Sequence, residues 1–176
     1  MNKSMVAKLE LQSSSLKFFR LVFVMCLQLF IPSGMSIAAE VNIPVASDFE
    51  QDGQIARSRN AVILLYFYAP DCRYCMKLEE AVLKPMLRSG DYDQQVLLRK
   101  VDWRSSTMVR GFSGQRISLN NLSERYTVKV TPTLVFVDPG GREVAPRILG
   151  FQSADFFWYY LDKNIKQSRI EMGRDL

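Results

Sequence analysis

The apolar positions of the chain fall into short continuous runs separated by stripes of helical spacing. Residues 61–68 form a continuous apolar run rich in β-branched and aromatic side chains, which predicts a buried central strand. Further strands are predicted over 96–102 and 133–137. A turn signal, Asp138-Pro139-Gly140-Gly141, follows the latter, so residues 143–149 are predicted to return as a strand. Pro146 inside this run favours an edge position.

Helical segments are predicted between these strands. Asp48 is expected to cap a helix over 49–58, and two others are predicted over 118–126 and 153–167, with a polar, frayed tail from Ser168. A short hairpin is predicted over 107–117, and the aromatic run 156–160 is assigned to packing on the sheet. After residue 75, a core-facing helical stripe is expected that Pro85 breaks or restarts; its members are Leu78, Ala81, Val82, Pro85 and Met86.

The order of the predicted elements bounds the architecture. Helix, strand, helix, strand, helix, strand, strand and helix follow one another from residue 40 to 176, with no internal repeat and no low-complexity linker. This order predicts an α/β domain with a central mixed sheet flanked by helices on both faces.

The first 39 residues have the pattern of a secretory signal peptide. A basic start precedes a short apolar run over 21–31, a break at 32–34 and small residues that offer a cleavage site near Ala38 or Ala39. The alternative is an uncleaved segment that anchors the protein to a membrane. Because the apolar run is shorter than the ~20 residues that a spanning helix needs, cleavage and export are favoured.

Export also changes the interpretation of charge. The whole chain has 23 basic and 18 acidic residues, a net charge of +5, whereas removal of residues 1–39 leaves 19 and 17, a net charge of +2. The apparent basicity therefore belongs largely to the signal, and nucleic-acid binding is not expected. The chain has no histidine, so the usual general base and the commonest metal ligand are both missing.

The residues best suited to chemistry are Cys72 and Cys75, the only cysteines beyond the signal segment. Disulfides persist in exported proteins, but a bridge between residues so close in sequence closes almost no loop and contributes little stability. Reactivity is therefore the favoured interpretation. An inert bridge or half of a zinc site are the alternatives, and zinc would need two further ligands.

The pair lies between a predicted strand and a predicted helix, which suits thiol–disulfide exchange. The unpaired N–H groups of a first helical turn favour the thiolate form of Cys72, Arg73 adds a positive charge and Asp71 opposes it. Cys72 is expected to attack a substrate disulfide, and the more buried Cys75 to resolve the mixed disulfide by attacking Cys72.

A second element, Val130-Thr131-Pro132-Thr133, precedes the strand at 133–137 and favours a rigid turn in which the proline can be cis. From about residue 45 to 167, the chain resembles the thioredoxin superfamily. The resemblance is carried by the strand, the cysteine pair, the run Ser-Glu-Arg-Tyr-Thr-Val-Lys-Val-Thr-Pro-Thr, the turn before residue 142 and the late Gly150. The resemblance implies a thioredoxin-like fold, a cis-Pro132 that faces the cysteines, and a Thr131 backbone that takes up substrate as an added strand.

Other details resemble the exported thioredoxin-related proteins of bacteria, which implies a periplasmic location. Two departures stand out. Asp71-Cys72-Arg73-Tyr74-Cys75 replaces Trp-Cys-Gly-Pro-Cys, and Tyr66 occupies the position of the buried acid behind the cysteines. Tyr74 before the second cysteine and Thr131 before the proline are more similar to periplasmic disulfide isomerases and glutaredoxins.

The sequence therefore predicts an exported thiol–disulfide oxidoreductase of the reductase or isomerase type. Its expected substrate is a protein disulfide, and a membrane electron donor is expected to keep it reduced. It is expected to act as a monomer, without a metal and with no cofactor besides the redox-active Cys72–Cys75 disulfide. The alternative is a non-catalytic assembly or metal-handling factor on the same scaffold, because fold alone does not settle function.

Overall fold

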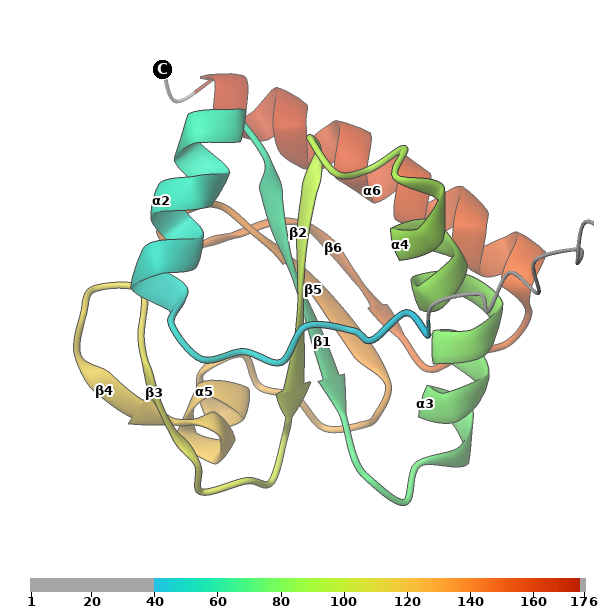
Figure 1. Cartoon of the computed structure of the whole chain (residues 1–176), viewed down its shortest axis with the longest axis horizontal. Coiled ribbons are helices and arrows are strands. Elements are labelled where there is room, and N and C mark those ends of the chain that lie inside the picture. Colours follow the sequence, from blue (N-terminus) through green and yellow to red (C-terminus); the bar gives the residue numbers. More distant parts are fainter. Residues whose placement is uncertain (1–39, 175–176) are drawn as a thin grey trace, which may run out of the picture. The chain divides into compact units, whose positions relative to one another are not determined.

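The computed structural model describes residues 40–174, so the predicted signal segment at 1–39 lies outside the described residues. A four-stranded sheet with the strand order β2-β1-β5-β6 forms the centre (Figure 1). β1 pairs with β2 in parallel, whereas β5 pairs with β1 and β6 in antiparallel fashion. The predicted mixed sheet is thereby confirmed, with the bounds β1 Val62–Tyr68, β2 Val96–Asp102, β5 Thr133–Val137 and β6 Glu143–Leu149. β6 is an edge strand, as Pro146 predicted.

Helices cover both faces of this sheet, as predicted. The α3, η1, α4 and α6 side chains pack in one hydrophobic cluster, and those of α2, α5 and the β3–β4 hairpin pack in the other. The bounds are α2 Phe49–Arg59, α3 Arg73–Leu78, η1 Glu79–Leu83, α4 Lys84–Ser89, β3 Met108–Arg110, β4 Arg116–Ser118, α5 Leu119–Arg125 and α6 Ala154–Arg174. Within residues 40–174, no helix combines the length and the apolar character that crossing a membrane requires.

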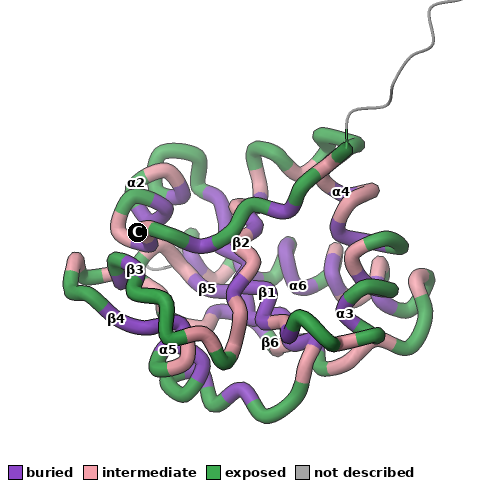
Figure 2. Tube along the Cα trace, turned by 60° about the horizontal axis from the view of Figure 1, so that its bottom comes forward, coloured by how far each residue is buried: buried purple, intermediate pink, exposed green. Residues whose placement is uncertain are grey.

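The central strand β1 divides its side chains between the two clusters. Because successive residues of a strand point to opposite faces, its apolar run supplies both cores at once. Figure 2 shows this strand in the buried interior. The first cluster receives Val62, Leu64 and Tyr66, the second Ile63, Leu65 and Phe67, and all six are fully buried.

The segment before β1 begins as predicted. The Asp48 side chain accepts a hydrogen bond of 2.9 Å from the backbone N–H of Gln51 and caps α2. Residues 40–47 form no strand but follow the outer side of β2, where the Ala46 N–H donates to the Lys100 carbonyl and the Lys100 N–H donates to the Pro44 carbonyl. These bonds pair part of the edge that β2 would otherwise expose.

The prediction of a core-facing helical stripe after the cysteines is only partly correct, because Ala81 is exposed. A π-helical turn, η1, separates α3 from α4, and the Lys84 N–H bonds to the Glu79 carbonyl five residues back. The wider turn shifts the buried face to Val82, Leu83 and Met86. The predicted restart at Pro85 is confirmed, since α4 begins at Lys84 and proline lacks an N–H for a continuous helical ladder.

The prediction of a frayed tail from Ser168 is wrong. Helix α6 continues to Arg174, and Ser168 and Met172 are buried. The polar groups of this stretch are satisfied internally, because the Ser168 hydroxyl donates to the Asn164 carbonyl and the Asn164 amide donates to the Pro146 carbonyl. The aromatic run is also only half core: Phe157 is buried, whereas Phe156 and Tyr159 are exposed.

Candidate functional site

The cysteine pair lies between the end of β1 and the first turn of α3. Cys72 is the N-cap of α3 and is disulfide-bonded to Cys75. The Cys75 backbone N–H donates to the Cys72 sulfur at 3.1 Å, as a capping side chain accepts from the first turn. Cys75 is 1% exposed, whereas Cys72 is partly exposed. Cys72 is therefore the sulfur that a partner can reach, and the same N–H is placed to stabilise its thiolate.

Three of the predicted neighbours of the pair lie on the surface. Asp71, Arg73 and Tyr74 are all exposed, and Tyr74 retains 58% of its accessible area. The Lys77 ammonium lies 5.8 Å from the centre of the Tyr74 ring. In the part of the chain that the structure describes, Asp71 and Arg73 form no ion pair, so both charges act on Cys72 from the solvent side.

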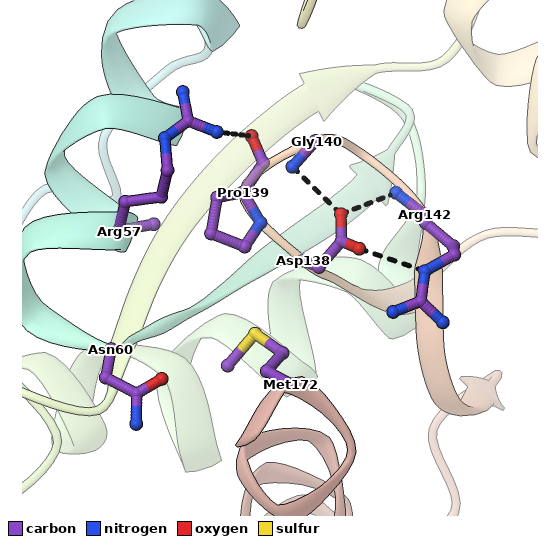
Figure 3. A pocket seen from close by; sticks show the side chains of 8 residues that line it. Arg57, Asn60, Asp138, Pro139, Gly140, Arg142 and Met172 are labelled. Carbon is purple, nitrogen blue, oxygen red and sulfur yellow. Dashed lines mark hydrogen bonds and ion pairs between the residues drawn. The ribbon is translucent and has the colours of Figure 1, made fainter. Parts of the chain in front are cut away.

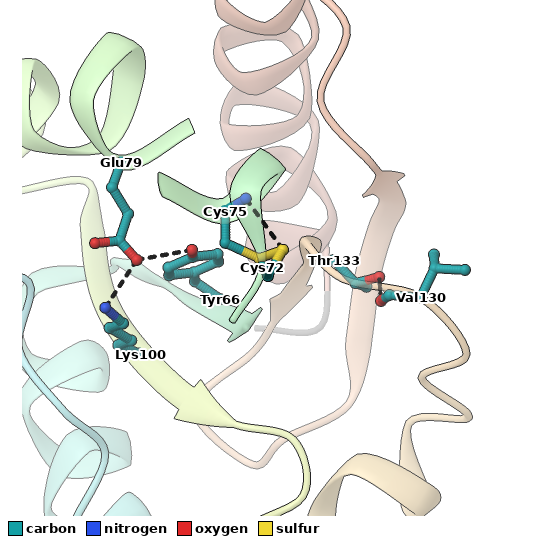
Figure 4. The surroundings of a disulfide bond; sticks show 7 residues. All are labelled: Tyr66, Cys72, Cys75, Glu79, Lys100, Val130 and Thr133. Atoms are coloured by element: carbon teal, nitrogen blue, oxygen red, sulfur yellow. Dashed lines mark hydrogen bonds and ion pairs between the residues drawn. A yellow bond between two sulfur atoms is a disulfide. The ribbon is translucent and has the colours of Figure 1, made fainter. Parts of the chain in front are cut away.

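The Thr131–Pro132 loop lies beside the disulfide. The bond between Thr131 and Pro132 is cis, and the carbonyl of Pro132 accepts a hydrogen bond of 2.8 Å from the Gly150 N–H. The Thr133 hydroxyl donates to the Val130 carbonyl at 2.7 Å, and Figure 4 shows Thr133 beside the bridge with Val130 farther from it. Among the described residues, the backbone of Thr131 has no hydrogen-bond partner. The loop thus presents unpaired backbone groups at the edge where Cys72 is reachable.

Tyr66 lies on the buried side of the disulfide and is linked to an acid. Its hydroxyl donates to Glu79 Oε1 at 2.9 Å, and Lys100 Nζ lies 2.7 Å from the same oxygen (Figure 4). Tyr66 is fully buried, and burial together with the negative charge of Glu79 raises its pKa well above the ordinary value. The phenol therefore remains a neutral donor to the carboxylate.

Glu79 supplies an acidic side chain near the cysteines, whereas strand β1 has Tyr66 at the position where an acid was expected. It follows Cys75 by four residues, and its N–H donates to the Cys75 carbonyl, so it lies one helical turn from the inner cysteine. The Glu79 and Lys100 side chains retain only 15% and 19% of their accessible area. A largely buried carboxylate, held by a cation and a phenol, therefore lies one helical turn from Cys75, although the strand position is Tyr66.

Sequence reasoning did not identify Glu79 or Lys100 as site residues. Two signals were present. Glu79 has helical spacing from Cys75, and Lys100 is a charged residue inside the apolar run that became β2. The register that brings Lys100 opposite Tyr66 was not predictable from either segment alone, since it depends on how the two parallel strands pair.

A separate hollow of about 280 Å³ lies at the far end of the sheet, where β5 ends rather than begins (Figure 3). Its polar groups are bonded to one another: Arg57 donates to the Pro139 carbonyl, and Asp138 accepts from the Gly140 N–H and from Arg142. This hollow is remote from the cysteines along β5 and contributes nothing to their chemistry. Among residues 40–174, no group of three or more acidic, cysteine or histidine side chains is arranged to hold a metal ion.

Comparisons with known proteins agree with this architecture. The model of the thioredoxin-like domain family matches residues 49–165, about two thirds of the chain. No curated protein sequence matches this chain. Similar solved structures include the periplasmic thioredoxin SoxS from Paracoccus pantotrophus in its reduced form, at 24% identity over 61% of this chain and 98% of that one, with a TM-score of 0.44. A thioredoxin-fold protein from Helicobacter pylori is 19% identical over 65% of this chain and 86% of that one, with a TM-score of 0.49. With the family model covering both the cysteine pair and the Thr131–Pro132 loop, this chain belongs to the thioredoxin-like domain family.

Proposed function

We propose that the protein is an exported thiol–disulfide oxidoreductase of the reductase or isomerase type that acts on protein disulfides. The observation that carries the proposal is the asymmetric disulfide: Cys72 is reachable and capped by the Cys75 N–H, while Cys75 is buried behind it. An inert bridge needs no such difference between its two sulfurs. In exchange chemistry, the outer sulfur must meet the substrate and the inner one must not.

The reaction begins with the dithiol form. The Cys72 thiolate attacks one sulfur of the client disulfide, so that a Cys72–client bond forms, the client S–S bond breaks and one client sulfur leaves as a thiolate. Cys75 then loses its proton and attacks Cys72, which releases the second client sulfur and closes the Cys72–Cys75 bond. Two electrons have passed from protein to client, and an external dithiol donor must return them.

The deprotonation of Cys75 needs an acceptor in a buried site. Glu79 supports this step because it lies one turn from Cys75 and is held by Lys100 and Tyr66. The Lys100 charge also favours the anionic forms that appear there. The replacement of the strand acid by Tyr66 therefore leaves the site with a base.

Client binding is the role that we propose for the Thr131–Pro132 loop. The unpaired backbone of Thr131 offers hydrogen bonds to an extended client segment, which would lie against the bridge as an added strand. The export pattern of residues 1–39 supports a periplasmic location, where a membrane electron donor would supply the electrons and the protein would act as a monomer.

Trapping tests the proposal directly. Cys75→Ser leaves Cys72 able to form the mixed disulfide but removes the group that resolves it. The purified variant from an exporting host should therefore carry a client protein that reductant releases, while the Cys72→Ser, Cys75→Ser double variant should carry none. A folded, exported Cys75→Ser variant with no attached protein would count against the enzyme.

A redox titration separates the enzyme from a non-catalytic scaffold. The bridge of an oxidoreductase should open and close within the range of glutathione buffers, and the reduced protein should reduce insulin. A bridge that remains closed across that range would favour an assembly factor on the same fold.

A further inference from the structure

A groove runs along the outer side of the domain between strand β6 and helix α6. Its volume is about 430 Å³, and we name it the β6–α6 groove. The residues that matter here are the apolar Leu149, Phe156 and Tyr160, the basic Arg147 and Lys163, and the amide Asn164. Neither the reaction nor the Thr131–Pro132 loop accounts for this feature.

One end of the groove lies at the end of β6 that adjoins the Thr131–Pro132 loop. Leu149 is the last residue of β6 and pairs with Thr133, which lies next to the bridge. The following residue, Gly150, donates its N–H to the Pro132 carbonyl. A chain that pairs with Thr131 can therefore continue past Leu149 into the groove.

The end near the site is apolar and open to solvent. Leu149 is 58% exposed and Phe156 is 44% exposed, although both are large hydrophobic side chains. The Phe156 and Tyr160 rings contact each other, with their centres 4.4 Å apart, so they form a fixed apolar surface. The Leu149 side chain lies on the other face of β6, because its partner Thr133 pairs with Phe67 of the α2–α5 cluster. Exposed apolar side chains that contact each other, as Phe156 and Tyr160 do, mark interaction sites more often than isolated ones do.

The other end is basic. Among residues 40–174, no carboxylate lines the groove, while Arg147 and Lys163 both do. Arg147 is held by Glu143 and by the Tyr126 carbonyl. Lys163 is exposed and forms no ion pair among the described residues. The free charge in the groove is therefore that of Lys163, which favours an acidic partner.

The length of the groove sets the length of its occupant. Its lining extends along α6 from Phe156 to Gln167, which at 1.5 Å per residue is roughly 16 Å. An extended segment rises about 3.3 Å per residue, so about five residues fit. Lys163 lies seven residues beyond Phe156, roughly 10 Å, and an acidic side chain should therefore follow an apolar one by about three positions.

We propose that the β6–α6 groove binds an extended segment of the client protein, about five residues long, that flanks the cysteine captured by Cys72. An apolar side chain of this segment packs on Phe156 and Tyr160, and an acidic side chain pairs with Lys163. The inference rests on the proposed function and specifies which clients the enzyme prefers.

Two synthetic peptides test the inference. Each contains one cysteine bonded through a disulfide to 2-thiopyridine, followed by an extension with one leucine and, three positions later, either glutamate or lysine. The reduced protein attacks the peptide sulfur, breaks that disulfide and expels pyridine-2-thiolate, whose absorbance gives the rate constant. We expect the glutamate peptide to react about fivefold faster than the lysine peptide at low salt, and high salt should reduce the difference.

Variants locate the preference. Lys163→Gln should remove the difference between the peptides, and Phe156→Ala should slow both about fivefold. Lys166→Gln is the matched control, because Lys166 is an exposed lysine on the same helix outside the groove. Neutral 2,2′-dithiodipyridine should react equally with all variants. Equal rates for both peptides in every variant, with normal dithiodipyridine reactivity, would overturn the groove and leave the oxidoreductase intact. A protein inert to dithiodipyridine and peptides alike would overturn the oxidoreductase.

Discussion

The Tyr66 hydroxyl donates a 2.9 Å hydrogen bond to the carboxylate of Glu79. This contact joins the central strand β1 to the first residue of η1, the π-helical turn that follows α3 (Figure 4). The carboxylate comes from the helix, and the strand supplies a phenol that orients it. Lys100 completes the arrangement from β2. In the proposed reaction these two residues have separate tasks: Glu79 would take a proton, and Tyr66 would fix the position of its carboxylate.

The first prediction concerns proton transfer from Cys75. Glu79→Gln removes the only carboxylate of this network, so resolution of the mixed disulfide should slow by about 10²-fold near neutral pH, while attack by Cys72 should remain unchanged. Rapid-mixing measurements of client release and of mixed-disulfide formation separate the two steps. Glu80→Gln is the control, because Glu80 is the exposed neighbour that pairs with Lys84 on the surface. Equal slowing of both steps would assign Glu79 a general structural role instead.

The second prediction concerns the stability of the network. Tyr66→Phe keeps the ring in the core but removes the hydrogen bond to a charged acceptor, so the oxidised protein should lose about 2 kcal/mol of unfolding free energy. Denaturant unfolding of the disulfide form measures the change. Resolution should slow only modestly, because Lys100 still holds Glu79. A loss of catalysis as large as that of Glu79→Gln would make the phenol itself a proton carrier.

The third prediction concerns alkaline pH. Burial raises the pKa of Tyr66 above the ordinary value of 10, and burial does the same for Tyr126, whose hydroxyl donates to the Gly141 carbonyl. Both therefore retain their protons in the folded state while the unfolded chain loses them. Their stabilising contribution is complete below pH 10 and declines above it, by up to about 1.4 kcal/mol per pH unit for each tyrosine. Chemical unfolding of the oxidised protein from pH 9 to 11 should show this decline, and Tyr66→Phe should make it shallower.

The sequence predicted those parts of the fold that local patterns determine. The run 61–68 was predicted as a buried strand from its length and its β-branched and aromatic residues. Cys72 was placed correctly at a helix start, because strand, turn and helix are contiguous in the sequence. Local patterns did not predict the π turn that exposes Ala81, because its register depends on packing against the sheet. They also failed for Ser168, whose polarity suggested solvent but whose hydroxyl bonds within α6.

The candidate site divides in the same way. The cysteine pair was predicted from residue type and spacing, whereas the roles of Thr131 and Pro132 were predicted from the resemblance to the thioredoxin superfamily. Glu79 and Lys100 were not predicted, because their role depends on the parallel pairing of β1 with β2 and on the position of η1 over the sheet. A sequence in which one buried acid is absent therefore does not exclude another acid from an adjacent element.

The last prediction concerns an ion pair on the opposite face of the sheet. Asp52 and Arg99 are both largely buried, and the guanidinium bonds both carboxylate oxygens, with Nε 2.9 Å from Oδ2 and Nη2 2.5 Å from Oδ1. Asp52→Ala leaves the Arg99 charge buried without its partner, so unfolding should require about 3 kcal/mol less free energy. Adding Arg99→Met to the same protein should recover most of that loss. In a buried ion pair, the attraction between the two charges mainly offsets the cost of burying them, so the pair adds little net unfolding free energy. The rate of Cys72 with dithiodipyridine should be unchanged in both variants, since the pair packs away from the cysteines. A double variant as unstable as Asp52→Ala alone would show that Arg99 supports α2 through contacts other than this carboxylate.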